Sequence, residues 1–159
     1  MMTLTTTETQ FITLIKAAVS GGNCPTANMN WPDIFALAKE QKLLPILFEA
    51  VRKTPAAEEN AALFVTIKQQ VIGQVLSQTM RSAEFSELYR KLRAAGLHPI
   101  VVKGQLCSRL YPLKDYRLSG DDDLYITEDE FFDCHKTLLA NGLITDTPAE
   151  DLQLSLIHI

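Results

Sequence analysis

Residues 99–126, PIVVKGQLCSRLYPLKDYRLSGDDDLYI, decide the fold. An apolar run stops at Lys103-Gly104, and a segment with helical spacing follows it. A polar loop then leads to Gly120, three consecutive aspartates and a second apolar run. These segments span, in order, residues 100–102, 105–111, 112–119 and 124–126. The order predicts a strand, a glycine turn, a short helix, a loop and a second strand.

The three aspartates stand at the entrance to the second predicted strand. Side chains on a strand alternate between its two faces, so Asp121 and Asp123 should share a face that Asp122 does not. Two neighbouring carboxylates repel each other unless a cation lies between them. Mg²⁺ or Mn²⁺, which prefer oxygen ligands, would meet that need. The alternative is a solvated acidic turn without a metal.

This stretch resembles the nucleotidyltransferase fold superfamily, and most of all its branch of uncharacterised nucleotidyltransferases. That branch has a Lys-Gly turn after the first strand and then an Arg-x-x-Gly-Asp-x-Asp run. The residues that carry the resemblance are Lys103, Gly104, Leu110, Tyr111, Pro112, Arg117, Gly120, Asp121, Asp123 and Leu124.

The resemblance implies metal-dependent transfer of a nucleoside monophosphate from a triphosphate such as ATP to an unknown acceptor, either a protein or a small molecule. Asp121 and Asp123 would be the catalytic residues and the ligands of Mg²⁺ or Mn²⁺. Nucleotide binding would fall to five residues, Lys103, Gly104, Arg117, Ser119 and Gly120. Gly104 would let the backbone approach phosphate oxygens, with amides of the following helix directed at them.

Two of these roles have alternatives. Lys103 could instead be a lysine at a strand end in solvent. Arg117 could contact a phosphate or pair with an aspartate.

Asp122 departs from the family, in which an aliphatic residue usually packs inward at this position. A carboxylate on that inward face is costly to bury, so either the strand begins later or Asp122 lies at an exposed edge. A third carboxylate usually completes such a site, and Asp146 is the one weak candidate after Ile126. Both departures favour an alternative function, a non-catalytic member that binds a nucleotide or a partner. A metal-dependent glycosyltransferase also uses Asp-x-Asp, but the Lys-Gly turn and the helical front end argue against it.

Composition restricts the class of protein. The chain has 159 residues, 47% of them hydrophobic, and a net charge of −4, which gives no strong nucleic-acid signal. Its three cysteines lack metal-site spacing and predict free buried thiols in a reducing cytoplasm. We find no secretory signal and no apolar run long enough for a membrane helix, so we expect a cytoplasmic protein without a membrane partner.

Residues 1–95 are expected to form a helical N-terminal region. Capping and turn residues mark a helix that ends at Gly21-Gly22, a second that begins at Trp31 and a third within residues 42–51. Residues 56–95 have a long helical pattern that fits one helix or two.

Residues 96–153 are expected to form a partial nucleotidyltransferase core. It should contain strands at His98–Val102, Asp123–Ile126 and Leu143–Thr145, and a helix introduced by a Thr127/Glu130 capping box. The fold class is therefore α+β, with the N-terminal helices packed beside a small mixed sheet of the polymerase-β type.

The last six residues, LSLIHI, are unusual. The same string recurs in translated sequencing adapters. We therefore expect residues 154–159 to be a non-native tail and the chain to be a C-terminally truncated family member.

Overall fold

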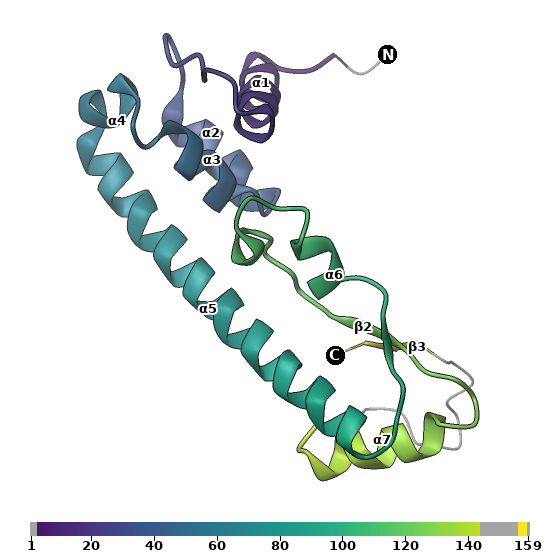
Figure 1. Ribbon diagram of the computed structural model, residues 1–159. Helices are drawn as coiled ribbons and strands as arrows, with labels where there is room; N and C mark the ends of the chain where they lie inside the picture. The colour runs from purple at the N-terminus through teal and green to yellow at the C-terminus, as the bar shows by residue number, and fades with distance from the viewer. Residues whose placement is uncertain (1–2, 144–155, 159) are drawn as a thin grey trace. The chain divides into compact units, whose positions relative to one another are not determined.

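The computed structural model describes residues 3–143 and the backbone of residues 156–158. Figure 1 shows the helices and strands in order along the chain. The chain divides into two compact units. The first comprises residues 1–77 and 116–118, and the second comprises residues 78–115 and 119–159. The long helix α5, Ala61–Ala94, contributes residues to both.

The first unit is helical. It contains α1 (Thr6–Ser20), α2 (Trp31–Glu40), α3 (Leu44–Val51) and α4 (Pro55–Glu59). The predicted first three helices are confirmed, and the expected capping residues begin α1. There Thr5 Oγ1 accepts the Glu8 N–H at 3.2 Å, and Glu8 Oε2 accepts the Thr5 N–H at 2.7 Å.

A hydrophobic cluster holds these helices together. Trp31 packs edge-on against Phe64 with ring centroids 5.6 Å apart, and fully buried aliphatic residues surround the aromatic group. The fully buried members are Leu14, Ile34, Ala38, Leu44, Leu47 and Val51.

The long helical pattern resolves into two helices. The first is α4, which ends at Glu59 with Asn60 as its C-cap, and the second is α5. Asn60 interrupts the helix because its backbone, with φ −118° and ψ 35°, departs from helical values, and its Nδ2 donates to the Ala56 carbonyl at 2.9 Å.

The second unit contains a small sheet in the order β1-β2-β3. Its strands are β1 (Ile100–Val101), β2 (Asp123–Tyr125) and β3 (Leu156–His158). The α+β class is confirmed, and the first two predicted strands are neighbours, with Val101 opposite Leu124. Both strand pairs among the described residues are antiparallel, where the prediction was a mixed sheet.

The strand boundaries differ from the prediction for a physical reason. β1 begins at Ile100 and not at His98, because Pro99 has no N–H to donate and the His98 N–H binds the Glu130 carboxylate. The predicted strand Leu143–Thr145 and the candidate ligand Asp146 extend outside the described residues. β3 lies within the segment expected to be non-native, and its register places His158 opposite Asp123.

The capping box predicted before α7 (Phe131–Ala140) is wrong. Glu130 is itself the residue at the N-cap, and α7 has no side-chain cap. The Glu130 carboxylate instead accepts the His98 N–H at 2.8 Å and contacts His98 Nδ1 at 2.6 Å. It therefore links α7 to the entrance of β1.

A second hydrophobic cluster fills this unit. It joins the C-terminal half of α5 to β2 and α7 through Phe85, Leu88, Leu92, Leu97, Leu124, Ile126, Phe131, Cys134 and Leu138. All three cysteines are free, but only Cys134 is fully buried, and burial raises its pKa to about 11.

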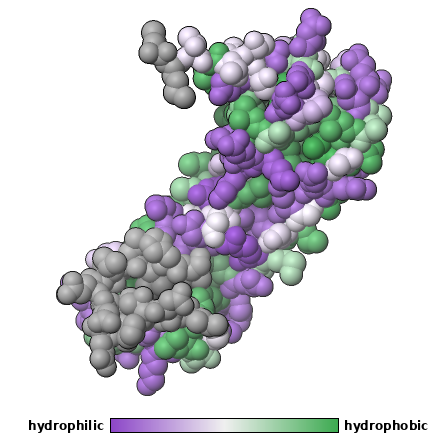
Figure 2. Space-filling view, turned by 180° about the vertical axis from the view of Figure 1, so that it is seen from behind, coloured by the Kyte–Doolittle hydropathy of each residue, from purple (hydrophilic) through white to green (hydrophobic). Residues whose placement is uncertain are grey.

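Hydrophilic and hydrophobic residues are interspersed on the face drawn in Figure 2. Among the exposed apolar side chains are Val65, Ile72 and Leu76 of α5. None of the helices in the described part of the chain has the length and apolar character needed to span a membrane.

Candidate functional site

The Lys103-Gly104 turn directly follows β1. Gly104 has φ +57° and ψ −107°, a conformation that favours glycine. A Cβ at this position would also overlap the Asp122 carboxylate, since Asp122 Cγ lies 2.9 Å from where that Cβ would be. Both the backbone conformation and the close approach of Asp122 therefore require glycine here.

Asp122 faces inward, where the family usually has an aliphatic residue. Its side chain is buried, and Oδ1 accepts the Gln105 N–H at 3.1 Å. β2 begins at Asp123, so the first of the two alternatives, a strand that begins after Asp122, is confirmed, and Asp122 does not lie at an exposed edge. The hydrogen bond offsets part of the cost of burying the carboxylate.

This bond also changes the expected phosphate site. Gln105 is the first residue of α6 (Gln105–Ser108), and its amide was expected to point at phosphate oxygens. In the structure that amide already donates to the Asp122 carboxylate.

Asp123 and Lys103 form an ion pair. Lys103 Nζ lies 3.0 Å from Asp123 Oδ2, and the Asp123 side chain is only 1% exposed while that of Lys103 is 64% exposed. The hydrogen bond and charge of Asp123 raise the pKa of Lys103, and the charge of Asp121 adds to this rise. Asp121 and Asp123 thus both act on the Lys103 ammonium, whereas Asp122 faces Gln105.

The loop before the aspartates is fixed to α5 by residues that sequence reasoning missed. Arg81 donates from Nη1 to the Ser119 carbonyl at 2.8 Å and from Nη2 to the Gly120 carbonyl at 2.5 Å. Gln78 Oε1 accepts the Ser119 N–H at 2.9 Å. Ser119 Oγ donates to the Asp121 carbonyl at 2.7 Å, which ties the loop to the first aspartate.

A second group of polar contacts lies on the same turn of α5. Asp115 accepts from Thr79 Oγ1 at 2.9 Å and from Ser82 Oγ at 3.4 Å. Gln105 Nε2 donates to Ser82 Oγ at 3.2 Å, which connects this turn of α5 to α6. The signal was present in the sequence, because Gln78 and Ser82 interrupt an otherwise apolar helical stripe.

Arg117 is described with the first unit. Its side chain is partly buried, and Nη1 has no hydrogen-bond partner among the described residues. The ion pairs found in the described part of the chain do not include one between Arg117 and an aspartate, the alternative to a phosphate contact.

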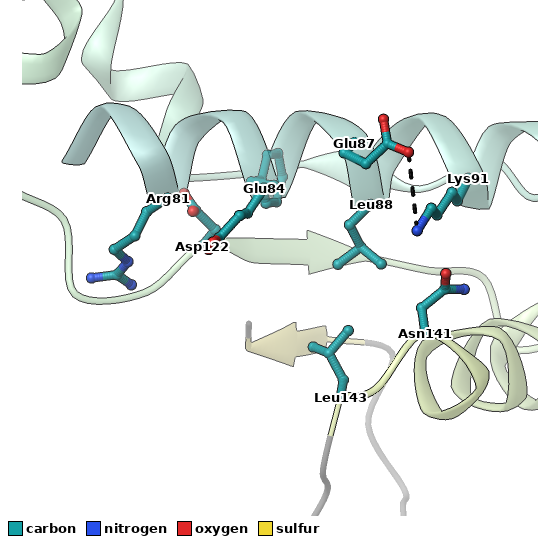
Figure 3. A pocket seen from close by; sticks show the side chains of 9 residues that line it. Arg81, Glu84, Glu87, Leu88, Lys91, Asp122, Asn141 and Leu143 are labelled. Atoms are coloured by element: carbon teal, nitrogen blue, oxygen red, sulfur yellow. Dashed lines mark ion pairs between the residues drawn. The ribbon is translucent and has the colours of Figure 1, made fainter. Parts of the chain in front are cut away.

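A pocket of about 420 Å³ lies between α5 and the residues that follow α7, with Asp122 in its lining (Figure 3). Asp122 and Arg81 line it together with acidic and basic residues of α5. Across it from α5 lie Asn141 and Leu143, which follow α7. Lys91 and Glu87 also line it, with Lys91 Nζ 4.0 Å from Glu87 Oε1. The pocket is therefore lined by Asp122 and not by Asp121 or Asp123.

Two carboxylates, those of Asp121 and Asp123, act on the Lys103 ammonium and are the metal-ligating groups predicted from the sequence. The Lys103 ammonium already brings a positive charge to the buried Asp123 carboxylate, and the Asp121 charge acts on the same ammonium. Carboxylate oxygens are the ligands that Mg²⁺ and Mn²⁺ prefer. The described residues contain no group of three or more His, Cys, Asp or Glu side chains that could hold a metal.

Comparison with known proteins identifies the family. A family model described as uncharacterised nucleotidyltransferase matches residues 27–156, a range that includes the Lys103-Gly104 turn and all three aspartates. Neither the comparison with curated proteins nor that with solved structures gave a match. Nucleotidyl transfer is the general function that the family match supports. The chain therefore belongs to the family of uncharacterised nucleotidyltransferases.

Proposed function

We propose that this protein transfers a nucleoside monophosphate from a nucleoside triphosphate to an acceptor, which is a protein or a small molecule. Asp121 and Asp123 hold a Mg²⁺ or Mn²⁺ ion in this proposal. The observation that carries it is the Lys103–Asp123 ion pair, in which a buried carboxylate faces an exposed ammonium that Asp121 also influences.

Burial of Asp123 suits it to binding a cation. A carboxylate with 1% exposure has lost most of its contact with water, so a charge partner stabilises it more than it would at the surface. Lys103 provides that partner in the free protein. With a divalent cation bound, Asp123 would no longer need Lys103 as its charge partner. The exposed lysine side chain would then be available to contact a triphosphate as a mobile point charge.

The other four proposed nucleotide-binding residues divide into two kinds. Gly104 gives the turn its conformation, and Ser119 and Gly120 shape the loop through bonds to α5. Arg117 is described with the first unit, and its contact with a phosphate stays a prediction from the family resemblance. When bound, the divalent ion would supply charge stabilisation at the phosphate and a lower pKa for the attacking hydroxyl.

Label transfer tests the proposal. The purified chain is incubated with α-labelled nucleoside triphosphates, ATP first, together with Mg²⁺ and a lysate that contains candidate acceptors. We expect label on an acceptor, and we expect Asp121→Asn and Asp123→Asn to abolish it. Asp129→Asn, which alters an exposed aspartate after β2, is the matched control and should transfer normally. Transfer that survives in both site variants would refute the roles of Asp121 and Asp123.

A second candidate is a non-catalytic member that binds a nucleotide or a partner. The observation that favours it is the Asp122–Gln105 bond, since an internal carboxylate takes the amide expected to bind phosphate. Calorimetry with Mg²⁺ and ATP separates the two functions. Nucleotide binding without label transfer to any acceptor would support the non-catalytic role.

A further inference from the structure

We propose that Arg81 is the positioning residue for Asp121, an inference that rests on the proposed function. Arg81 lies on α5, within the long helical stretch, and touches neither Asp121 nor Asp123 through any bond found in the described residues. Its two terminal nitrogens instead hold the carbonyls of Ser119 and Gly120, the two residues directly before Asp121.

The geometry explains why arginine does this. The two Nη atoms are fixed in one plane, so two bonds of 2.8 and 2.5 Å restrict both the position and the rotation of the Ser119–Gly120 segment. Lysine has a single nitrogen on a flexible stem and cannot make this fork. Gln78 adds a third bond from the same helix by accepting the Ser119 N–H.

Asp121 needs these hydrogen bonds because of its place in the chain. Asp123 belongs to β2, and backbone bonds such as Val102 N–H to Asp123 O at 3.1 Å fix it. Asp121 is exposed, precedes the strand and has its carbonyl bound by Ser119 Oγ. Its position therefore depends on the Ser119–Gly120 loop, and the loop depends on Arg81.

Mn²⁺ titration of the full chain tests this positioning role, with the metal alone as the probe. Four variants are compared: Arg81→Lys, Asp121→Asn, the double variant, and Arg90→Lys. Arg90 lies on the same helix but is exposed, and among the described residues its ion pair is with Glu87, so it is the matched control. Since groups that support a metal ligand typically affect affinity by tenfold or more, we expect Arg81→Lys to weaken Mn²⁺ binding roughly tenfold.

The double variant separates positioning from general destabilisation. If Arg81 acts through Asp121, Arg81→Lys should weaken Mn²⁺ binding no further once Asp121 is already asparagine. Thermal unfolding of each variant shows whether it is folded. If Arg81→Lys does not fold, Gln78→Leu loosens the same loop by removing one bond and takes its place.

The outcomes distinguish the two proposals. Unchanged Mn²⁺ affinity in Asp121→Asn would overturn the proposed metal site, and the inference with it. Weakened binding in Asp121→Asn but not in Arg81→Lys would overturn the inference alone. Fully additive losses in the double variant would show that Arg81 does not act through Asp121.

Discussion

Asp122 differs from its two neighbours in the direction of its carboxylate. It binds the Gln105 amide, whereas Asp121 and Asp123 act on Lys103. We therefore predict that Mn²⁺ affinity falls strongly in Asp121→Asn and Asp123→Asn and much less in Asp122→Asn. Calorimetric titration of the three variants provides the measurement. Equal losses at all three positions would contradict this assignment of faces.

Gly104 offers a comparison with Gly96 at the same scale. Both have positive φ, but a Cβ at Gly96 meets no atom within 4 Å, whereas one at Gly104 overlaps Asp122. Gly96→Ala should lose about 1 kcal/mol of the free energy of unfolding, the cost of the backbone conformation alone. Gly104→Ala should lose more, because Asp122 must also move. Urea denaturation of both variants measures the difference, and equal losses would rule out the close-approach argument.

At the scale of elements, Glu130 links α7 to β1. The hydrogen bonds from the His98 side chain and from the His98 N–H lower the pKa of Glu130. A carboxylate with a lowered pKa stabilises the fold above its unfolded pKa, near 4.5, and loses that effect as the pH falls through the lowered value.

We therefore predict that Glu130→Gln lowers the thermal midpoint at neutral pH and that the difference from the unmodified chain vanishes in acid. Thermal unfolding followed from about pH 7 to about pH 3 measures this effect. Glu128→Gln, two residues earlier and exposed, is the control and should unfold like the unmodified chain throughout. A Glu130→Gln difference that stays constant over this range would show that the carboxylate charge does not matter.

The helices could be predicted from the sequence because their signals are local. The capping residues of α1, the proline in the first turn of α2 and the apolar spacing all act within a few residues. The paired strands and the Lys103-Gly104 turn were also predicted, since short apolar runs and a glycine mark them. Whether the strands pair in parallel or antiparallel could not be predicted, because the residues of one strand do not determine which strand lies beside it or in which direction that strand runs.

The hydrogen bonds from Arg81 and Gln78 to the loop before Asp121 could not be predicted for a related reason. Arg81 forms hydrogen bonds with Ser119 and Gly120, which lie 38 and 39 positions later in the sequence. Gln78 forms one with Ser119, 41 positions later. Gln78 interrupts the apolar spacing of α5, but that spacing does not indicate which polar group its side chain binds. Glu130 illustrates the opposite error. A local pattern predicted that its carboxylate caps α7, but the carboxylate instead accepts the N–H of His98, 32 positions earlier in the sequence.

At the scale of the whole molecule, each compact unit has its own hydrophobic cluster. The cluster of the first unit contains Trp31 and Leu47, and that of the second contains Leu124 and Leu138. Separate clusters allow separate unfolding, because a domain with its own core can in principle fold alone. The site residues Lys103, Asp121 and Asp123 belong to the second unit.

We predict that core mutations in the two units affect different probes. Leu47 and Leu124 are both fully buried, so replacing either with alanine should cost about 2–5 kcal/mol of local stability. Trp31 is the single tryptophan of the chain and lies in the first cluster, so its fluorescence reports that unit. Amide hydrogen exchange at Leu124 and Ile126 reports the second unit.

Leu47→Ala should shift the fluorescence transition to lower denaturant and leave exchange at Leu124 and Ile126 nearly unchanged. Leu124→Ala should accelerate exchange at Ile126 and leave the fluorescence transition in place. If both variants shift both probes together, α5, which contributes to both clusters, couples the units into one cooperative fold, and the prediction fails.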